Sequence, residues 1–150
     1  MMATNRRKSA RAAGGTPTPD GFTRMAREFV LAAQLVLNRA SSVLHPAYFL
    51  LGRSIELLLK AYLLDCHVAI DVLRHTPYGH DLEALLQESI SRGVLDVAAL
   101  TEQDKATIRL LSGDYADKRF EYVASGATYH LPIIELTEQV AVKLLSALKG

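Results

Sequence analysis

The chain is poor in cysteine, with Cys66 alone among 150 residues. One cysteine excludes an intrachain disulfide and suits a reducing compartment. The chain also lacks an apolar run of the about 18 residues that a membrane span needs. Its basic start, MMATNRRKSARAAGG, has no apolar segment of the kind that secretory signals carry. Together these absences predict a cytoplasmic protein that is not associated with a membrane.

A strong excess of charge is absent as well, because the formal net charge is +1. Residues 1–18 hold four basic residues and no acid, so the rest of the chain has 13 basic against 16 acidic residues. A mildly acidic folded part argues against a broad basic face for duplex nucleic acid, which needs clustered Lys and Arg. A small local binding site remains open.

Several sequence patterns of known chemistry are missing too. The chain shows no strand alternation, internal repeat, glycine-rich phosphate loop or Ser-His-Asp order. Its histidines His67, His75 and His80 have no recognised metal-ligand spacing, and one cysteine supplies no second sulfur ligand. We therefore expect neither a metal site nor a cofactor.

Residues 1–20 combine basic and small residues with the stretch TPTPD. They hold too few large apolar side chains to offset the entropy of ordering them, so we expect a disordered basic tail there. Its cations could touch RNA or a membrane surface, although a solvated tail is the simpler interpretation. One folded domain is expected over residues 21–150.

Apolar residues at spacings of three and four predict four or five helices in that domain and an all-α fold. The second helix is apolar nearly all round, which places it in the middle of a bundle. Gly93 is expected to end the third helix in a left-handed conformation, and Thr101 with Asp104 to cap the fourth. The expected helices cover about residues 22–40, 46–66, 80–92, 101–115 and 132–148.

A narrow polar stripe follows the second of these helices. At about 100° per residue, its members fall within an arc of about 60°. The stripe is either a set of ion pairs within the helix or the lining of a cleft or dimer interface. Spacing alone favours the ion pairs, because charged stripes are usually solvated faces. Its members are Arg53, Glu56, Lys60 and His67.

Four pieces of sequence are notable for their order along the chain: LLGRSIELLLKAYLL at 50–64, GHDLEALL at 79–86, DYADKRFEY at 114–122 and HLP at 130–132. In this order they resemble the HEPN domain family of bacteria and archaea, over about residues 22–148. The resemblance implies an up-and-down bundle of four to five helices, often a homodimer. Family members include metal-independent ribonucleases of toxin–antitoxin and phage-defence systems, companions of small nucleotidyltransferases, and inactive versions that bind RNA or a nucleotide.

The family's ribonucleases pair an arginine with a histidine a few residues later. The histidine moves a proton of the 2′-hydroxyl or the leaving oxygen, while the arginine holds the phosphate. Arg39 with His45, and Arg74 with His80, match this pattern, each with five residues between them. The first pair lies ahead of the central helix. The second has His75 where the family usually has another polar residue.

The later half of the chain, where the ribonuclease motif normally lies, departs from the family pattern. Arg119 is followed by no histidine before His130. This departure favours a binding function over RNA cleavage.

The stretch GHDL presents a choice between structure and chemistry. Asp81 can cap the third helix, and His80 can bond to the polar stripe, which is the interpretation we favour. Alternatively His80, which titrates near neutral pH, lies in a cleft with Arg74 and Arg119 and meets a phosphate.

The stretch YADKRFEY offers a similar choice. Lys118, Arg119 and Tyr122 are residue types that hold phosphate and stack on a base. In the structural alternative, Phe120 lies in the core and Arg119 pairs with Glu56.

The sequence thus favours a cytoplasmic, homodimeric HEPN-like domain that binds RNA, a nucleotide or a nucleotidyltransferase-type protein partner without catalysis. One alternative is a metal-independent endoribonuclease that uses His80 with Arg74 or Arg119. The other is a purely structural dimeric interaction module. The candidate ligand-binding residues are Arg53, Glu56, Lys60, His80, Asp81, Lys118, Arg119 and Tyr122.

Overall fold

The computed structural model describes residues 15–122, 126 and 128–148 and is built of helices joined by turns and loops, with no strand in this part of the chain. This confirms the all-α prediction. No helix among these residues combines the length and apolar character needed to cross a membrane. The helices are α2 (Pro19–Arg39), α3 (Leu44–Asp65), α4 (Ile70–Leu73), α5 (Leu82–Ser91), α6 (Val94–Val97), α7 (Glu102–Ala116) and α8 (Ile134–Leu148).

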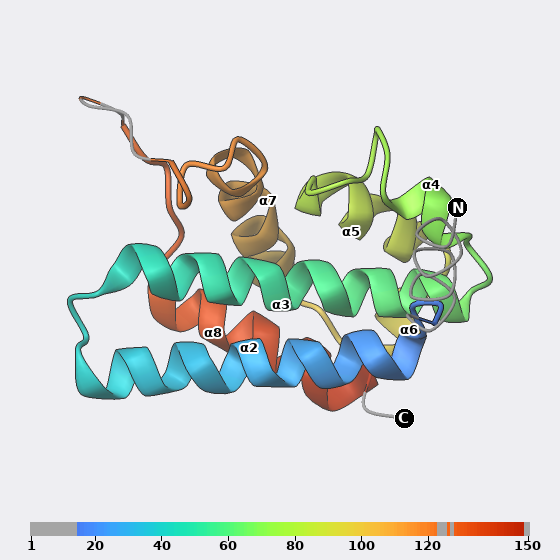
Figure 1. Ribbon diagram of the computed structural model, residues 1–150, viewed down its shortest axis with the longest axis horizontal. Helices are drawn as coiled ribbons and strands as arrows, with labels where there is room; N and C mark the ends of the chain where they lie inside the picture. The colour runs from blue at the N-terminus through green and yellow to red at the C-terminus, as the bar shows by residue number, and fades with distance from the viewer. Residues whose placement is uncertain (1–14, 123–125, 127, 149–150) are drawn as a thin grey trace, which may run out of the picture.

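Helix α3 lies at the centre of the fold (Figure 1). It runs antiparallel to α2, and α8 packs against both of these helices. On its other side α3 contacts α5 and α7, which also pack against each other. Because neighbours surround it, 13 of its 22 residues are buried, as its all-round apolar sequence predicted. The fully buried side chains of the core include Leu51, Ile55, Leu58, Leu82, Leu85, Ile108, Leu111, Val140 and Leu144.

The start of α2 differs from the expected boundary. The helix begins at Pro19, inside the segment 1–20 for which we expected a disordered tail. The Thr18 hydroxyl accepts the Gly21 N–H at 3.0 Å and caps the helix. Pro19 occupies the first helical position, where its fixed φ suits the helix and its missing N–H costs nothing. Residues 1–14 of the expected tail lie outside the described residues.

Local signals set the ends of two other helices as predicted. Gly93 has φ +92° directly after α5 and its cap residue, a conformation that favours glycine. Thr101 and Asp104 form a reciprocal capping box at α7, with hydrogen bonds of 3.1 and 2.8 Å. Helices α4 and α6 were not predicted, because four residues are too few to show a helical period.

A close approach of α7 to α3 depends on one glycine. A methyl group at Gly52 would lie 2.5 Å from Cδ2 of Tyr115, which is inside van der Waals contact. The Tyr115 ring therefore lies against the α3 backbone at a point where any larger side chain would displace it. Gly113, on α7 itself, has no such neighbour among the described residues, since a methyl group there meets no atom within 4 Å.

These two glycines make a matched pair for a stability test. Gly52→Ala should lower the free energy of unfolding by about 1–3 kcal/mol, because the added methyl group would overlap the Tyr115 ring. Gly113→Ala should raise it by about 0.5–1 kcal/mol, because alanine loses less entropy in a helix and has room for its methyl group. Urea denaturation followed by circular dichroism measures both, and equal stability of the two variants would contradict the packing argument.

Candidate functional site

The carboxylate of Glu56, in the middle of α3, is fully buried and accepts hydrogen bonds from four side chains. Its Oε2 atom accepts from Arg53 Nη1 at 2.5 Å and from Lys60 Nζ at 3.1 Å. Its Oε1 atom accepts from His80 Nδ1 at 2.7 Å and from the Tyr115 hydroxyl at 2.9 Å. These five residues, which we call the Glu56 cluster, satisfy a buried charge from α3, α7 and the loop before α5.

The protonation states within the cluster follow from these contacts. Burial by itself would raise the pKa of the Glu56 carboxyl, but Lys60, His80 and Arg53 together hold that pKa below its ordinary value. Burial, and then the Glu56 carboxylate, raise the pKa of Tyr115. Glu56 is therefore ionised and Tyr115 is neutral near pH 7. An ionised carboxylate only accepts hydrogen bonds, so Nδ1 of His80 carries a hydrogen.

The loop that carries His80 is tied to both neighbouring helices. Gly79 turns the chain at φ +47°, a value that favours glycine. Asp81 then caps α5, since its Oδ1 accepts the Ala84 N–H at 3.0 Å and the Ser112 hydroxyl of α7 at 3.2 Å. The predicted cap is confirmed, and these bonds occupy the Oδ1 atom of Asp81 with structural partners. They hold His80 in register with Glu56.

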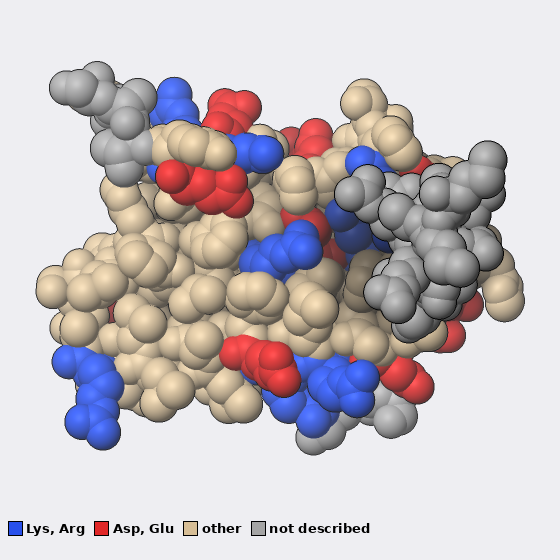
Figure 2. Space-filling model, in the orientation of Figure 1, with Lys and Arg blue, Asp and Glu red and all other residues tan. Residues whose placement is uncertain are grey.

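Two hollows meet at His80, whose side chain is 50% exposed. The inner hollow, of about 150 Å³, is lined by Phe49, Arg53, His80, Tyr115, Lys118 and Glu121. The loop hollow, of about 390 Å³, is lined by Arg74, His75, Thr76, Pro77, Tyr78, Gly79, His80, Asp81 and Ala116. Figure 2 shows basic and acidic side chains close together above α3, where α5 and α7 meet it. The inner hollow is the more basic of the two around its rim, with Arg53 and Lys118 against Glu121.

Arg119 does not join this site. Its guanidinium donates to Asp114 Oδ1 at 3.1 Å and to the Thr128 carbonyl at 2.6 Å. The structural alternative that paired Arg119 with Glu56 is therefore wrong, and Tyr115 contacts Glu56 instead. Asp114, five residues earlier, supplies the carboxylate that pairs with Arg119. Together with the bond to Thr128, this pair connects the segment after α7 to the helix. Sequence reasoning missed Tyr115, although its place on the buried stripe of α7 implies a buried hydroxyl that needs a partner.

The other candidate residues are spread over several surfaces. Lys118 is exposed and lines the inner hollow, whereas Tyr122 is 72% exposed and lines neither hollow. Arg74 lines the loop hollow and lies 3.8 Å from Asp71. His67 follows the end of α3 with φ +68° and is exposed, so the predicted stripe ends at Lys60. Of these four, only Lys118 and Arg74 share a hollow with His80.

The other arginine–histidine match, Arg39 with His45, does not share a hollow among the described residues. Arg39 is exposed at the end of α2, and His45 packs against the ring of Tyr129 at a centroid distance of 4.6 Å. The ring centroid of Phe120 lies 6.0 Å from that of His45. Phe120 also packs against the core, as the structural alternative for YADKRFEY predicted. Within the described ranges, no group of three or more His, Cys, Asp or Glu side chains lies close enough to hold a metal ion.

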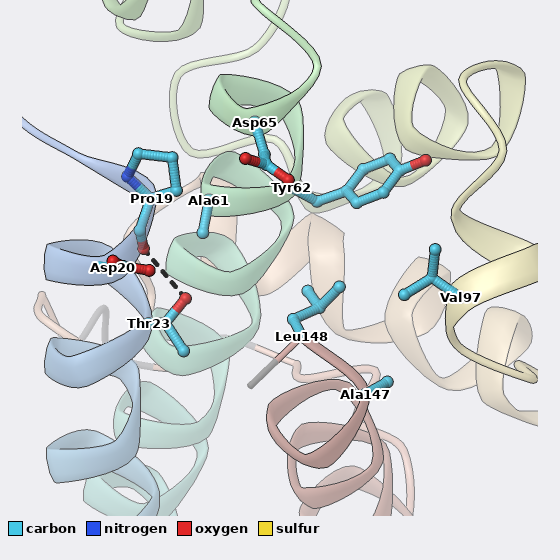
Figure 3. A pocket seen from close by; sticks show the side chains of 9 residues that line it. All are labelled: Pro19, Asp20, Thr23, Ala61, Tyr62, Asp65, Val97, Ala147 and Leu148. Atoms are coloured by element: carbon cyan, nitrogen blue, oxygen red, sulfur yellow. Dashed lines mark hydrogen bonds between the residues drawn. The ribbon is translucent and has the colours of Figure 1, made fainter. Parts of the chain in front are cut away.

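A further hollow, of about 290 Å³, has acidic and apolar side chains around it (Figure 3). It is formed where the start of α2 meets the ends of α3 and α8. Asp20 and Asp65 supply its charge, and Val97 and Leu148 supply apolar surface. No basic side chain is among the residues that line it, so it does not suit an anionic ligand.

Comparison with known proteins adds nothing to this geometry, since no family model, curated protein or solved structure matches the chain.

The Glu56 cluster makes a specific prediction about acid stability. Glu56→Gln leaves Arg53 and Lys60 without a counter-charge and should lower the free energy of unfolding by about 3 kcal/mol at pH 7. Because the folded-state pKa of Glu56 is lowered, its contribution is present above the unfolded carboxyl pKa of about 4.3 and is lost as the pH falls through the lower folded value. The variant should therefore lose less stability than the wild type over that range.

Urea denaturation at a series of pH values measures both effects. Glu88→Gln is the control, because Glu88 forms a partly exposed surface pair with Arg92 and its loss should change little. Equal effects of the two substitutions at pH 7 would contradict the role given to Glu56.

Proposed function

We propose that this chain is a HEPN-like domain that binds a phosphate group of RNA or of a nucleotide in the inner hollow, without catalysis of its own. The proposal rests on one observation: Arg53, Lys118 and His80 line the same small hollow. With it go the further proposals of an up-and-down helical bundle that acts as a homodimer in the cytoplasm. These follow from the sequence resemblance and from the apolar central helix.

The charges around the inner hollow support an anionic ligand. The Arg53 side chain is 31% exposed, so its guanidinium can bond to Glu56 on one edge and to a phosphate on another. Lys118 is exposed and adds a second cation at the rim. Glu121 opposes them with one carboxylate, while Lys60 offsets the charge of Glu56 beneath. The balance is one net positive charge with His80 neutral and two with His80 protonated.

The size of the inner hollow favours a single phosphate group over a whole ligand. About 150 Å³ is below the roughly 300 Å³ at which pockets for complete small molecules begin. The rest of the ligand would extend from the rim, where half-buried Phe49 offers an aromatic surface to a ribose or base.

A metal-independent endoribonuclease is the second candidate function. Arg74 and His80 both line the loop hollow, and the bond from Nδ1 to Glu56 leaves Nε2 of His80 free to act as a base. The binding function has the stronger support, because Arg119 is held by Asp114, and Arg74 lines the loop hollow but not the inner hollow. A purely structural module, or one docked to a nucleotidyltransferase-type partner, would leave the inner hollow unused.

Ligand binding can be tested without knowing the natural ligand. Uridine 5′-monophosphate and a short single-stranded RNA, each titrated into the protein by calorimetry or fluorescence anisotropy, should both bind if the phosphate is the recognised group. Lys118→Gln should weaken binding about tenfold, because it removes a charge-assisted hydrogen bond. Arg39→Gln, a substitution at an exposed arginine outside both hollows, is the control. Unchanged affinity in the Lys118 variant would reject the inner hollow.

RNA cleavage distinguishes the two candidate functions. We expect no cleavage when the protein is incubated with mixed single-stranded RNA in EDTA. Cleavage that is abolished by both His80→Ala and Arg74→Ala, in variants that keep the helical circular dichroism spectrum, would replace the binding proposal with the ribonuclease.

A further inference from the structure

The hydrogen-bonding state of His80 is set from inside the protein. Oε1 of the buried, ionised Glu56 lies 2.7 Å from Nδ1 of His80, and a carboxylate can only accept at that position. The hydrogen of a neutral His80 is therefore on Nδ1. Nε2, the other nitrogen of the half-exposed side chain, carries a lone pair when His80 is neutral and an N–H when it is protonated.

This assignment restricts which anions His80 can contact. A lone pair on Nε2 repels an ionised phosphate oxygen, so a direct contact requires one proton between the two atoms. Arg53 and Lys118 are permanently charged near pH 7 and need no such proton. His80 is thus the lining residue of the inner hollow whose contact with a phosphate depends on its protonation state.

The structure assigns the inner hollow to a terminal phosphomonoester, bound with the uptake of one proton shared between its oxygen and Nε2 of His80. This inference rests on the proposed function and narrows it. A phosphomonoester has a second pKa of about 6, so near pH 7 it either brings the proton itself or, as a dianion, holds His80 in its protonated form. The internal phosphodiester of an RNA chain carries one negative charge. It therefore brings a proton less readily than a monoester, and it stabilises a protonated His80 less than a dianion does. No covalent bond changes: a monoanionic ester already carries the shared proton, and for the dianion that proton comes from the solvent.

Other groups near His80 have to be separated from this effect. Glu56 stays ionised and Tyr115 stays neutral over the tested range, because the pKa of the first is lowered and that of the second is raised. His75 is the other histidine of the loop hollow, and its Nδ1 lies 2.6 Å from the Asp71 carbonyl. His75→Gln is therefore the matched control for His80→Gln. The titratable and charged groups that face His80 are Arg53, Glu56 and Lys60 on α3, Tyr115 on α7, Lys118 and Glu121 after α7, and Arg74, His75, Tyr78 and Asp81 in its own loop.

Calorimetry with three uridine probes tests the inference on the wild-type protein. The probes are uridine 5′-monophosphate, its methyl phosphodiester and uridine, each measured between about pH 6 and 8 in buffers of different ionisation enthalpy. We expect the monoester to bind at least about tenfold more tightly than the diester at pH 7. We expect it to take up close to one proton at pH 8, where the free monoester is a dianion. His80→Gln should abolish this proton uptake, and His75→Gln should retain it.

The outcomes separate this inference from the proposed function. Equal affinity for monoester and diester, or binding of the monoester at pH 8 without proton uptake, would overturn the monoester assignment and leave phosphate binding in place. If neither ester nor single-stranded RNA binds, the monoester assignment and the proposed phosphate-binding function are both overturned. The proton count is measured on the wild type, so the test holds even where His80→Gln disturbs the Glu56 cluster.

Discussion

The buried negative charge of Glu56 is the constraint on which the arrangement of this bundle depends. A carboxylate without water has to be compensated by hydrogen bonds and opposite charge, and α3 alone supplies only Arg53 and Lys60. The remaining two donors come from α7 and from the loop before α5. Three segments that are distant in sequence are thereby fixed relative to one another around one pair of oxygen atoms.

The apolar packing and the polar cluster support each other. The absence of a side chain at Gly52 lets the Tyr115 ring lie against α3, and this position brings the hydroxyl to Glu56. The bonds from Asp81 to Ala84 and Ser112 place His80 on the other side of the same oxygen. A buried ion cluster adds little net stability compared with apolar residues, but it is costly to disrupt in part. We infer that its contribution is to select one alignment of α3, α5 and α7 over others.

The features that were predictable from sequence are those set over short distances along the chain. The helix period, the Thr101 and Asp104 capping box and the Asp81 cap involve residues three or four positions apart. The Glu56 cluster joins residues 24 and 59 positions apart, so its partners could be placed only by the fold. Arg119 is the opposite case: a partner across the bundle was considered for it, but its partner is Asp114, only five positions away. The predicted homodimer and HEPN resemblance stay predictions.

The same carboxylate connects the stability of the fold to the chemistry at its surface. Glu56 fixes a hydrogen on Nδ1 of His80, because an ionised carboxylate only accepts hydrogen bonds at that position. The buried carboxylate thereby leaves Nε2 as the ring nitrogen that an anion at the surface would meet. Ligand binding, protonation and folding would then be linked, since a ligand that binds only the folded chain stabilises it in proportion to its occupancy. In such a linkage the fold need not move for the site to respond, because a single proton on one half-exposed ring carries the coupling.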